Sequence, residues 1–346
     1  MTITVVAAGD HFLLPALLRD AIEAASNEPL EVRELTLPWP DVPFGKVAEV
    51  DEASGTEEEL IAALEGARIC LTQMAPLTER ILAASPELRL FCVGRGGPVN
   101  VNVPAATAHG VGVCFAPGRN AAATAEHTVA LMLAAMRRIP QIHRELAAGT
   151  WRGDYYRYDR VGLELENRTV GLIGFGAIGS RVARILAAFG ARVLVHDPYV
   201  EPSALGDAAI SVGLDELISS SQIVSLHARL TDETRGLIDG KRIAAMPRGA
   251  VLVNCARGGL VDYDAVCDAL DDGHLFAAAF DVFPAEPIPR DSRLLRTPGI
   301  VMTPHLAGAS RETAHKAAAI VAADAARYLR GEHLLHCVNP EALEGR

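Results

Sequence analysis

Short apolar runs alternate with longer amphipathic stretches along the first third of the chain. The stretches DHFLLPALLRDAIEAAS and EEELIAALEGA have apolar positions at helical spacing. The runs between and after them are short and apolar, as in buried strands: MTITVVAAG, ARICLT, LRLFCVG and GVGVCFAPG. Strands that alternate with helices favour a parallel sheet covered by helices, so we predict a first α/β domain here.

An alanine-rich stretch over residues 119–151 has helical spacing and follows a break at Pro117–Gly118. Proline removes a backbone donor, so Pro140 should kink or interrupt this helix. Residues 152–167, RGDYYRYDRVGLELEN, are polar and aromatic without clear periodicity, and we interpret them as an arm or loop.

A second series of strands and helices begins at Thr169. Its strand-like runs are TVGLIG, VLVHD, IVSLHA, AVLVNCA, FAAAFDV and IVMTP, and the last helix is RETAHKAAAIVAADAARYLRG. Six short strands are what a complete dinucleotide-binding sheet requires. A chain of 346 residues also exceeds the size that one hydrophobic core usually serves. We therefore predict two α/β domains, each with a doubly wound parallel sheet.

The first run of the second series leads into a G-x-G-x-x-G turn formed by Gly174, Gly176 and Gly179. In a dinucleotide site these glycines allow the turn, the approach of backbone N–H groups to a pyrophosphate, and close helix packing. The next strand ends about twenty residues on at Asp197, which would accept hydrogen bonds from ribose hydroxyls. Asp197 would repel a 2′-phosphate and Pro198 follows it, so the pattern predicts NAD(H) rather than NADP(H). The alternative is a purely structural glycine turn.

Three later strand-like runs end in polar residues: Arg257, then Asp281 and Glu286, then His305. Ligands of open α/β sheets bind outside the carboxyl ends of the strands, so these side chains should converge. An arginine can hold a carboxylate or keto oxygen, and a histidine can protonate an alkoxide as hydride arrives at C2 of a 2-oxo acid. A carboxylate beside the histidine keeps it protonated near neutral pH. Taken singly, each residue could instead serve a salt bridge, an exposed loop or a loop cap.

Composition excludes several classes of protein. A formal net charge of −11 leaves no broad basic surface for nucleic acid. Met1–Ala8 is interpreted as a first strand rather than a signal peptide, and the apolar run His127–Met136 is too short to span a bilayer. The six cysteines form no C-x-x-C pair, which favours buried free thiols in a cytoplasmic protein over disulfides or a metal site.

Four motifs in order, GLIGFGAIGSRVA, VNCARGGLVD, AFDVFPAEP and TPHLAGAS, give the chain a family likeness. The chain resembles the D-isomer-specific 2-hydroxyacid dehydrogenases, which include D-3-phosphoglycerate dehydrogenase and glyoxylate/hydroxypyruvate reductase. The resemblance implies a triad in which Arg257 binds substrate, Glu286 orients and charges the histidine, and His305 is the acid/base. It places the cofactor, NAD, on these further positions: Ala177, Ile178, Asp197, Ala228, Cys255, Arg257, Asp281, His305 and Gly308.

The same resemblance assigns the domains. Residues 1–117 and 306–346 would form a discontinuous, flavodoxin-like substrate domain, and residues 118–305 an inserted Rossmann domain for NAD, with the cleft between them. A loop of the first domain would hold the substrate carboxylate through backbone N–H groups. The matching stretch VGRGGPVNVN makes Arg95, Gly96 and Gly97 the candidates, although an ordinary turn is the alternative.

The chain departs from the phosphoglycerate enzymes of this family in two ways. It ends about twenty residues beyond the last helix, without the regulatory domain of the long forms, and it has Thr72, Gln73 and Met74 where they have a loop arginine. Four arginines could still face a phosphate or second carboxylate, namely Arg95, Arg119, Arg157 and Arg229. The substrate thus stays open between a phosphorylated and an unphosphorylated 2-hydroxy acid.

Family members are typically homodimers joined through their NAD domains. By resemblance, the arm WRGDYYRYDR would put Tyr155, Tyr156 or Arg157 near the active site of the partner. Two other functions remain as alternatives: a non-catalytic NAD-binding sensor or corepressor, and a phosphite or formate dehydrogenase. Formate oxidation in related enzymes uses a glutamine in place of the triad carboxylate, so Glu286 argues against formate.

Overall fold

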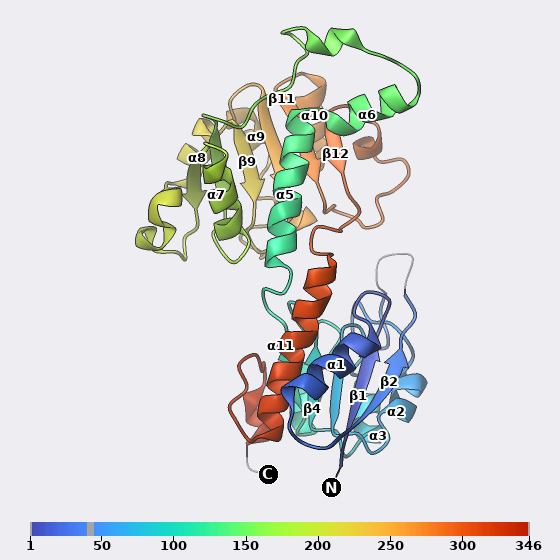
Figure 1. The fold of residues 1–346 in the computed structure, drawn as a ribbon. Helices are drawn as coiled ribbons and strands as arrows, with labels where there is room; N and C mark the ends of the chain where they lie inside the picture. The colour runs from blue at the N-terminus through green and yellow to red at the C-terminus, as the bar shows by residue number, and fades with distance from the viewer. Residues whose placement is uncertain (1, 40–44, 345–346) are drawn as a thin grey trace. The chain divides into compact units, whose positions relative to one another are not determined.

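The computed structural model describes residues 2–39 and 45–344 of the chain, which folds into two compact units (Figure 1). One unit comprises residues 1–120 and 309–346, and the other comprises residues 121–308. Each division lies three residues beyond the predicted crossing, at 117/118 and at 305/306. Met1 and residues 345–346, which the predicted substrate domain includes, lie outside the described residues, as do residues 40–44.

The first unit contains a five-stranded parallel sheet with the strand order β2-β1-β3-β4-β5. Its strands are β1 (Ile3–Gly9), β2 (Leu30–Thr36), β3 (Ile69–Thr72), β4 (Leu90–Val93) and β5 (Gly112–Phe115). This order is that of flavodoxin-like folds, as predicted. Strand β2 was missed because it lies at the sheet edge, and none of its residues is fully buried.

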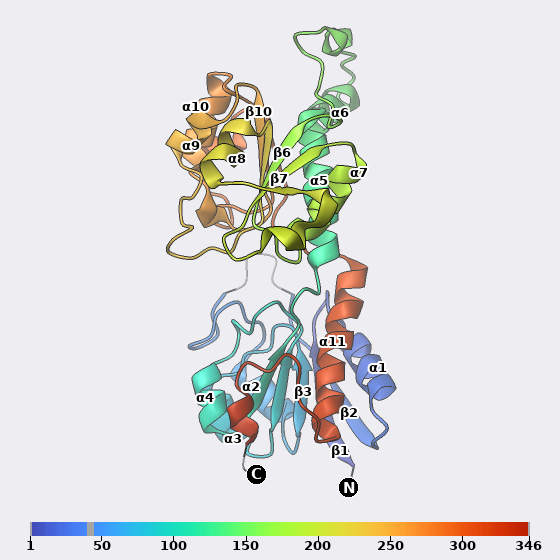
Figure 2. The ribbon, with the colours of Figure 1, turned by 90° about the vertical axis from the view of Figure 1, so that its left-hand side faces the viewer.

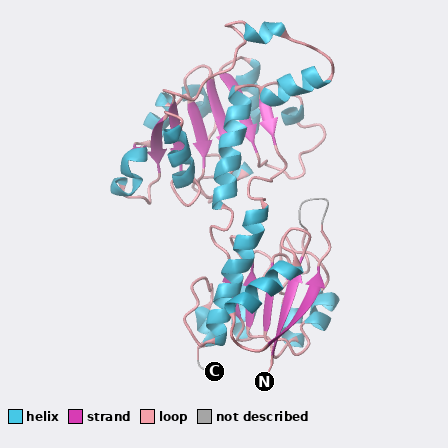
Figure 3. Ribbon diagram, in the orientation of Figure 1, coloured by secondary structure: helices cyan, strands magenta, loops and turns pink. Residues whose placement is uncertain are grey.

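Helices cover both faces of this sheet (Figure 3). One face packs against α2 (Glu57–Ala63), α3 (Glu79–Ala84) and α4 (Val103–Ala108). The other packs against α1 (Pro15–Ala25) and the distant α11 (Arg311–Leu329), which lie side by side. Helix α11 contributes mostly alanines to this core, and their small side chains let the helix pack closely. The end of the chain therefore completes the core of the first unit, and a 3-10 turn, η5 (Pro340–Leu343), follows.

The second unit contains a seven-stranded parallel sheet with the order β12-β11-β10-β9-β6-β7-β8. Its strands are β6 (Thr169–Ile173), β7 (Arg192–His196), β8 (Ile210–Ser211), β9 (Ile223–Leu226), β10 (Ala250–Asn254), β11 (Leu275–Phe280) and β12 (Ile300–Met302). Renumbered from β6, the order is the 3-2-1-4-5-6 arrangement of a Rossmann sheet with one strand added. All six predicted strands are present, and the seventh is the two-residue β8.

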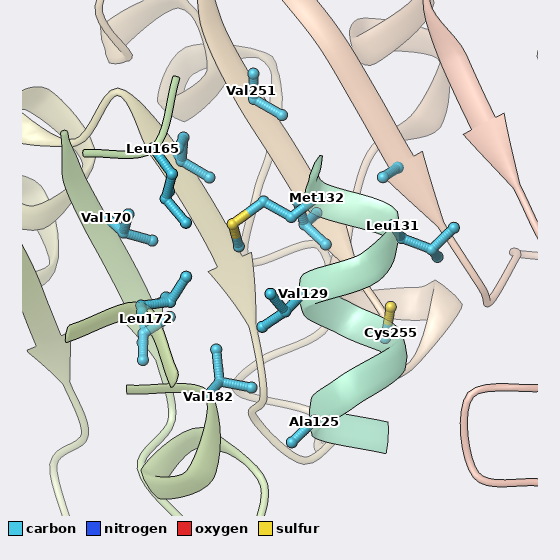
Figure 4. Packing of buried hydrophobic residues seen from close by; sticks show 14 of the residues in the cluster. Ala125, Val129, Leu131, Met132, Leu165, Val170, Leu172, Val182, Val251 and Cys255 are labelled. Carbon is cyan, nitrogen blue, oxygen red and sulfur yellow. The ribbon is translucent and has the colours of Figure 1, made fainter. Parts of the chain in front are cut away.

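Two helical layers bury this second sheet. One layer is formed by α5 (Ala121–Met136) and α7 (Gly179–Ala188), and the other by α8 (Leu214–Ser220), α9 (Gly240–Ala245) and α10 (Tyr263–Asp271). Figure 4 shows Val129 and Met132 of α5 pointing toward Leu172 and Val251 of the sheet. Both α5 side chains are at least 95% buried, so this helix is packed firmly on one face of the sheet.

The predicted interruption of the long helix is present. Helix α5 ends at Met136, Arg138 has a φ of 54°, and α6 (Ile139–Ala147) begins with Pro140 in its first turn. No residue of α6 is buried, and the arm with its 3-10 turn η1 (Gly153–Tyr156) extends away from the sheet (Figure 2). Among the described residues, no helix is both long and apolar enough to cross a membrane.

Candidate active site

The glycine turn joins β6 to α7, and two of its glycines are sterically required. Gly174 has a φ of 100°, and a Cβ placed on it would lie 2.7 Å from the carbonyl carbon of His227. A Cβ on Gly179 would lie 2.2 Å from the carbonyl oxygen of Gly174. A Cβ on Gly176, by contrast, would meet nothing within 4 Å. The first and third glycines thus close the turn, and the second leaves open space beside its backbone.

Helix α7 starts at this open space, and no side chain caps its N-terminus. Its first-turn N–H groups carry a partial positive charge that favours an anion. Ala177 is exposed, and Ile178 is half-buried against the core. The uncapped N-terminus of α7 and the open space beside Gly176 together fit the pyrophosphate of a dinucleotide.

Asp197 follows β7 and lies beside the same turn. Its Oδ2 accepts a hydrogen bond from Phe175 N–H at 2.7 Å, and its Oδ1 accepts one from Tyr199 N–H at 3.0 Å. Each oxygen keeps a lone pair for a ribose hydroxyl. Ala228 also borders the turn, because its amide nitrogen lies 2.8 Å from the Cβ position of Gly174.

The predicted catalytic residues lie at the carboxyl ends of three adjacent parallel strands. Arg257 follows β10, Asp281 and Glu286 follow β11, and His305 follows β12. Because these strands are neighbours and parallel, their ends meet at one edge of the sheet, as predicted. The glycine turn follows β6 of the same parallel sheet and so lies at the same edge.

Glu286 and His305 form a hydrogen-bonded pair. The distance from His305 Nδ1 to Glu286 Oε2 is 2.8 Å, and Glu286 Oε1 accepts from Phe283 N–H at 2.9 Å. A carboxylate only accepts, so Nδ1 carries the proton of this hydrogen bond and Nε2 is the ring nitrogen left for other partners. The histidine side chain is 52% exposed, and its Nε2 has no hydrogen-bond partner among the described residues.

Asp281 holds the loop that carries His305. The carboxylate is fully buried and accepts hydrogen bonds from Thr303 Oγ1 at 2.5 Å and from the N–H groups of Leu306 and Ala307 at 2.8 Å. The Asp281 carbonyl accepts from His305 N–H at 2.8 Å, and His305 has a φ of 53°. These bonds fix an uncommon left-handed conformation at His305. Cofactor binding by Asp281 stays a prediction.

Sequence reasoning missed three residues that support this pair. Thr303 Oγ1 lies 2.9 Å from His127 Nε2, so a histidine of α5 reaches the same loop. A Cβ on Gly258 would lie 1.9 Å from the carbonyl oxygen of Phe283, so the Arg257 loop presses against the loop that carries Glu286. The sequence holds no signal for these contacts: His127 sits in an apolar helix, and Gly258 is one of two adjacent glycines.

Arg257 shares the sheet edge with this pair but does not contact it. Its guanidinium is exposed, donates to the Ala256 carbonyl at 2.7 Å and makes no ion pair among the described residues. The buried Asn254 side chain donates to the Arg257 carbonyl at 2.9 Å, which fixes the backbone of this loop. The arginine therefore remains available to an anionic ligand.

Two predicted cofactor positions, Cys255 and Gly308, could contact a cofactor mainly through their backbone. The Cys255 thiol lies in the core beside α5 (Figure 4), and burial raises its pKa to about 12. A cofactor could therefore meet the backbone of Cys255 and not a thiolate. Gly308 is the last residue of the second unit. All six cysteines are free thiols and five are buried, as predicted, and the described residues contain no cluster of metal-ligating side chains.

The predicted carboxylate loop follows β4 in the first unit. A Cβ on Gly96 or Gly97 would meet nothing within 4 Å, so their backbone faces open space. Arg95 pairs with the Glu52 carboxylate and also donates to the Glu52 carbonyl at 3.1 Å. The glycines thus suit anion capture better than the arginine side chain does.

Two of the remaining candidate arginines lie in the second unit. Arg157 pairs with Asp159 at 3.1 Å in the arm. Arg229 is exposed and makes no ion pair among the residues described. Neither residue is tied to the pair of Glu286 and His305.

Comparison with known proteins identifies the relatives of this chain. Residues 129–307 match the family model described as the NAD-binding domain of D-isomer-specific 2-hydroxyacid dehydrogenases. The D-3-phosphoglycerate dehydrogenase of Mycobacterium tuberculosis is 40% identical over 299 residues, which are 86% of this chain and 56% of that protein. The glyoxylate reductase of Korarchaeum cryptofilum is 34% identical over 298 residues, which are 86% of this chain and 90% of that protein.

Solved structures give the same result. The TT0316 protein of Thermus thermophilus matches with a TM-score of 0.78 and 31% identity over 97% of this chain and all of that chain. A D-lactate dehydrogenase of Treponema pallidum matches with a TM-score of 0.80 at 23% identity, covering 98% of this chain and 99% of that one, which shows the shared fold. The chain spans little more than half the length of the phosphoglycerate dehydrogenases that it matches.

Proposed function

Because the chain belongs to the D-isomer-specific 2-hydroxyacid dehydrogenase family, we propose that it interconverts a 2-oxo acid and a D-2-hydroxy acid with NAD. The observation that carries this proposal is the 2.8 Å hydrogen bond between Glu286 and His305. The pair lies at the sheet edge that also bears the open glycine turn and the exposed Arg257.

In this proposal the bound NAD supplies or accepts the hydride at C2 of the substrate. His305 Nε2 donates a proton to the oxygen on C2 during reduction and takes it back during oxidation. Glu286 orients the imidazole through the hydrogen bond to Nδ1. Arg257 holds the carboxylate or keto oxygen through its planar fork of donors, and the N–H groups of Gly96 and Gly97 bind the carboxylate.

The test follows the absorbance of NADH with glyoxylate, hydroxypyruvate, hydroxypyruvate 3-phosphate, pyruvate and branched 2-oxo acids. The names of two relatives, glyoxylate reductase and phosphoglycerate dehydrogenase, point to glyoxylate and to hydroxypyruvate 3-phosphate. We expect turnover of at least one acid with NADH and much slower turnover with NADPH, because Asp197 repels a 2′-phosphate. NADH binding without turnover of any acid would contradict the proposal.

We also propose a cytoplasmic homodimer joined through the second unit. Helix α6 buries no residue, and the arm exposes Trp151, Tyr156 and Tyr158 by 82%, 93% and 98%. Clustered apolar surface of this kind marks an interaction site. Tyr155 is held differently, because its hydroxyl contacts the Glu145 carboxylate at 2.9 Å. Sedimentation at micromolar concentration should give a dimer for the chain and a monomer for Trp151→Ser combined with Tyr156→Ser, whereas a monomeric unmodified chain would contradict the proposal.

A further inference from the structure

The first unit has its own ligand-binding position at the carboxyl edge of its sheet. Strands β1 and β3 are neighbours there, yet the helices that follow them, α1 and α3, pack on opposite faces. In flavodoxin-like sheets, ligands bind at this switch point between the two strands. Asp10 directly follows β1, and Gln73 directly follows β3.

Asp10 and Gln73 are buried together at the switch point. Asp10 is fully buried, its Oδ1 accepts from the N–H groups of Phe12 and Leu13, and its Oδ2 accepts from Gln73 Nε2 at 3.2 Å. Gln73 is only 5% exposed, and its Oε1 has no hydrogen-bond partner among the described residues. A buried acceptor without a partner costs about 1–3 kcal/mol, so this oxygen is poised for a donor.

Arg119 adds an unpartnered cation at the same place. Its Nε and Nη1 are buried and make no hydrogen bond within the described part of the chain. Its guanidinium carbon lies 5.8 Å from the centre of the Phe12 ring, next to the segment that Asp10 holds. Burial, and then the positive charge of Arg95, lower the pKa of Arg119 to about 10, while Asp10 opposes the shift without forming an ion pair. Among the described residues, this largely buried guanidinium therefore has no carboxylate in ion-pair contact.

We propose that Arg119 and Gln73 form a binding site for a second anionic group of the substrate, a carboxylate or a phosphate. The donors of Arg119 bind this group by charge-assisted hydrogen bonds, and Gln73 Oε1 accepts from the P–OH when the group is a singly protonated phosphate. The proposal rests on the proposed function for the identity of the ligand. Such a site would favour 2-oxo acids that carry a second negatively charged group.

Thermal unfolding of the full chain tests the site without turnover. Inorganic phosphate and, separately, malonate are added at constant ionic strength to the unmodified chain, Arg119→Met, Arg119→Lys and the control Arg80→Met. Arg80 is an exposed arginine that pairs with Glu57 and Glu58. Arg80→Met therefore removes one positive charge, as Arg119→Met does, but at a surface ion pair.

We expect at least one anion to raise the melting temperature of the unmodified chain, the lysine variant and the control by more than that of Arg119→Met, which keeps the other anion-binding groups. Without anion, Arg119→Met should melt higher than the unmodified chain, because it removes a buried charge without a partner. An equal response of Arg119→Met to both anions, or a lower melting temperature without anion, would overturn the site. A rise in melting temperature with phosphate alone would indicate a phosphate ligand, and a rise with malonate alone would indicate a carboxylate ligand.

Kinetics then tests the ligand. Arg119→Met should raise KM about 10- to 100-fold for hydroxypyruvate 3-phosphate or 2-oxoglutarate, as expected for lost hydrogen bonds to a charged group, and leave KM for hydroxypyruvate unchanged. An equal rise for all acids would overturn the selection of a second anionic group. If no acid is turned over by any form, the proposed function fails, and the melting experiment still decides the anion site.

Discussion

The polar side chains at the carboxyl edges of the two sheets differ in how completely they are hydrogen-bonded. In the second unit, the buried Asp281 accepts three hydrogen bonds through its carboxylate, and Glu286 uses both of its oxygens. In the first unit, Arg119 and Gln73 bury polar atoms that have no partner among the described residues. Groups that perform chemistry are thus held in place before any ligand arrives. Groups that recognise a ligand complete their hydrogen bonds only with it.

The largest expected effect comes from His305, whose imidazole is half exposed. Replacing His305 by Gln should lower kcat by about 10²- to 10⁴-fold, because a positioned acid/base contributes about that much. Its side chain is half exposed, so the melting temperature should stay nearly constant. Stopped-flow turnover, with NADH binding followed by fluorescence, checks this. Parallel losses of NADH affinity and turnover would instead assign His305 a structural role.

A substitution at Gly258 tests whether the pair of Glu286 and His305 depends on its backbone support. Gly258→Ala should displace the Phe283 carbonyl and with it the N–H group that binds Glu286. We expect a loss of roughly 2–3 kcal/mol in stability, with a lower melting temperature and reduced kcat. The matched control is Gly259→Ala, whose Cβ would meet only the side-chain methyls of Leu230 and the Arg235 guanidinium. Equal behaviour of the two variants would contradict preorganisation through this contact.

A substitution at Asp197, beside the glycine turn of the second unit, tests whether a hydrogen-bonded carboxylate there sets the choice of cofactor. Asp197→Asn keeps an oxygen for Phe175 N–H but removes the negative charge. The dissociation constant of NADH should rise about tenfold, because hydrogen bonds to charged groups contribute more than neutral ones. The preference for NADH over NADPH should shrink, which parallel kinetics with both cofactors measures. Glu201→Gln, an exposed carboxylate four residues on, should leave the preference unchanged.

The sequence sufficed for features that repeat along the chain. Apolar runs located every strand of the second sheet except β8, which is two residues long and exposed, and every strand of the first sheet except the edge strand β2. Both exceptions lack the buried apolar run on which the prediction depends. The return of α11 to the first unit came from the family resemblance, since periodicity alone does not say which core a helix joins.

The proximity of Glu286 and His305 could be predicted, because both follow strands whose carboxyl ends meet at one edge of the sheet. Their supports could not, because a contact such as that of Gly258 with Phe283 depends on two loops distant in sequence. Arg119 was one of four arginines that could face an anion, and the sequence could not rank them, since a buried and an exposed arginine look alike in a sequence. Unpartnered atoms are a property of packing and appear only in three dimensions.

The effect that should be smallest at neutral pH concerns His227, which lies beside the glycine turn. Its Nε2 lies 3.0 Å from Ser225 Oγ, and burial lowers the pKa of His227 to about 4. Between pH 6.5 and 4 the unfolded chain binds a proton at this histidine and the folded chain does not. The free energy of unfolding therefore falls by at most about 1.4 kcal/mol for each pH unit of acidification in this range. His227→Gln removes this term, so its melting temperature should fall less steeply from pH 6.5 to 4.5. Identical pH profiles would mean that His227 titrates normally in the fold, and the second unit would then hold this group less rigidly than its carboxylates.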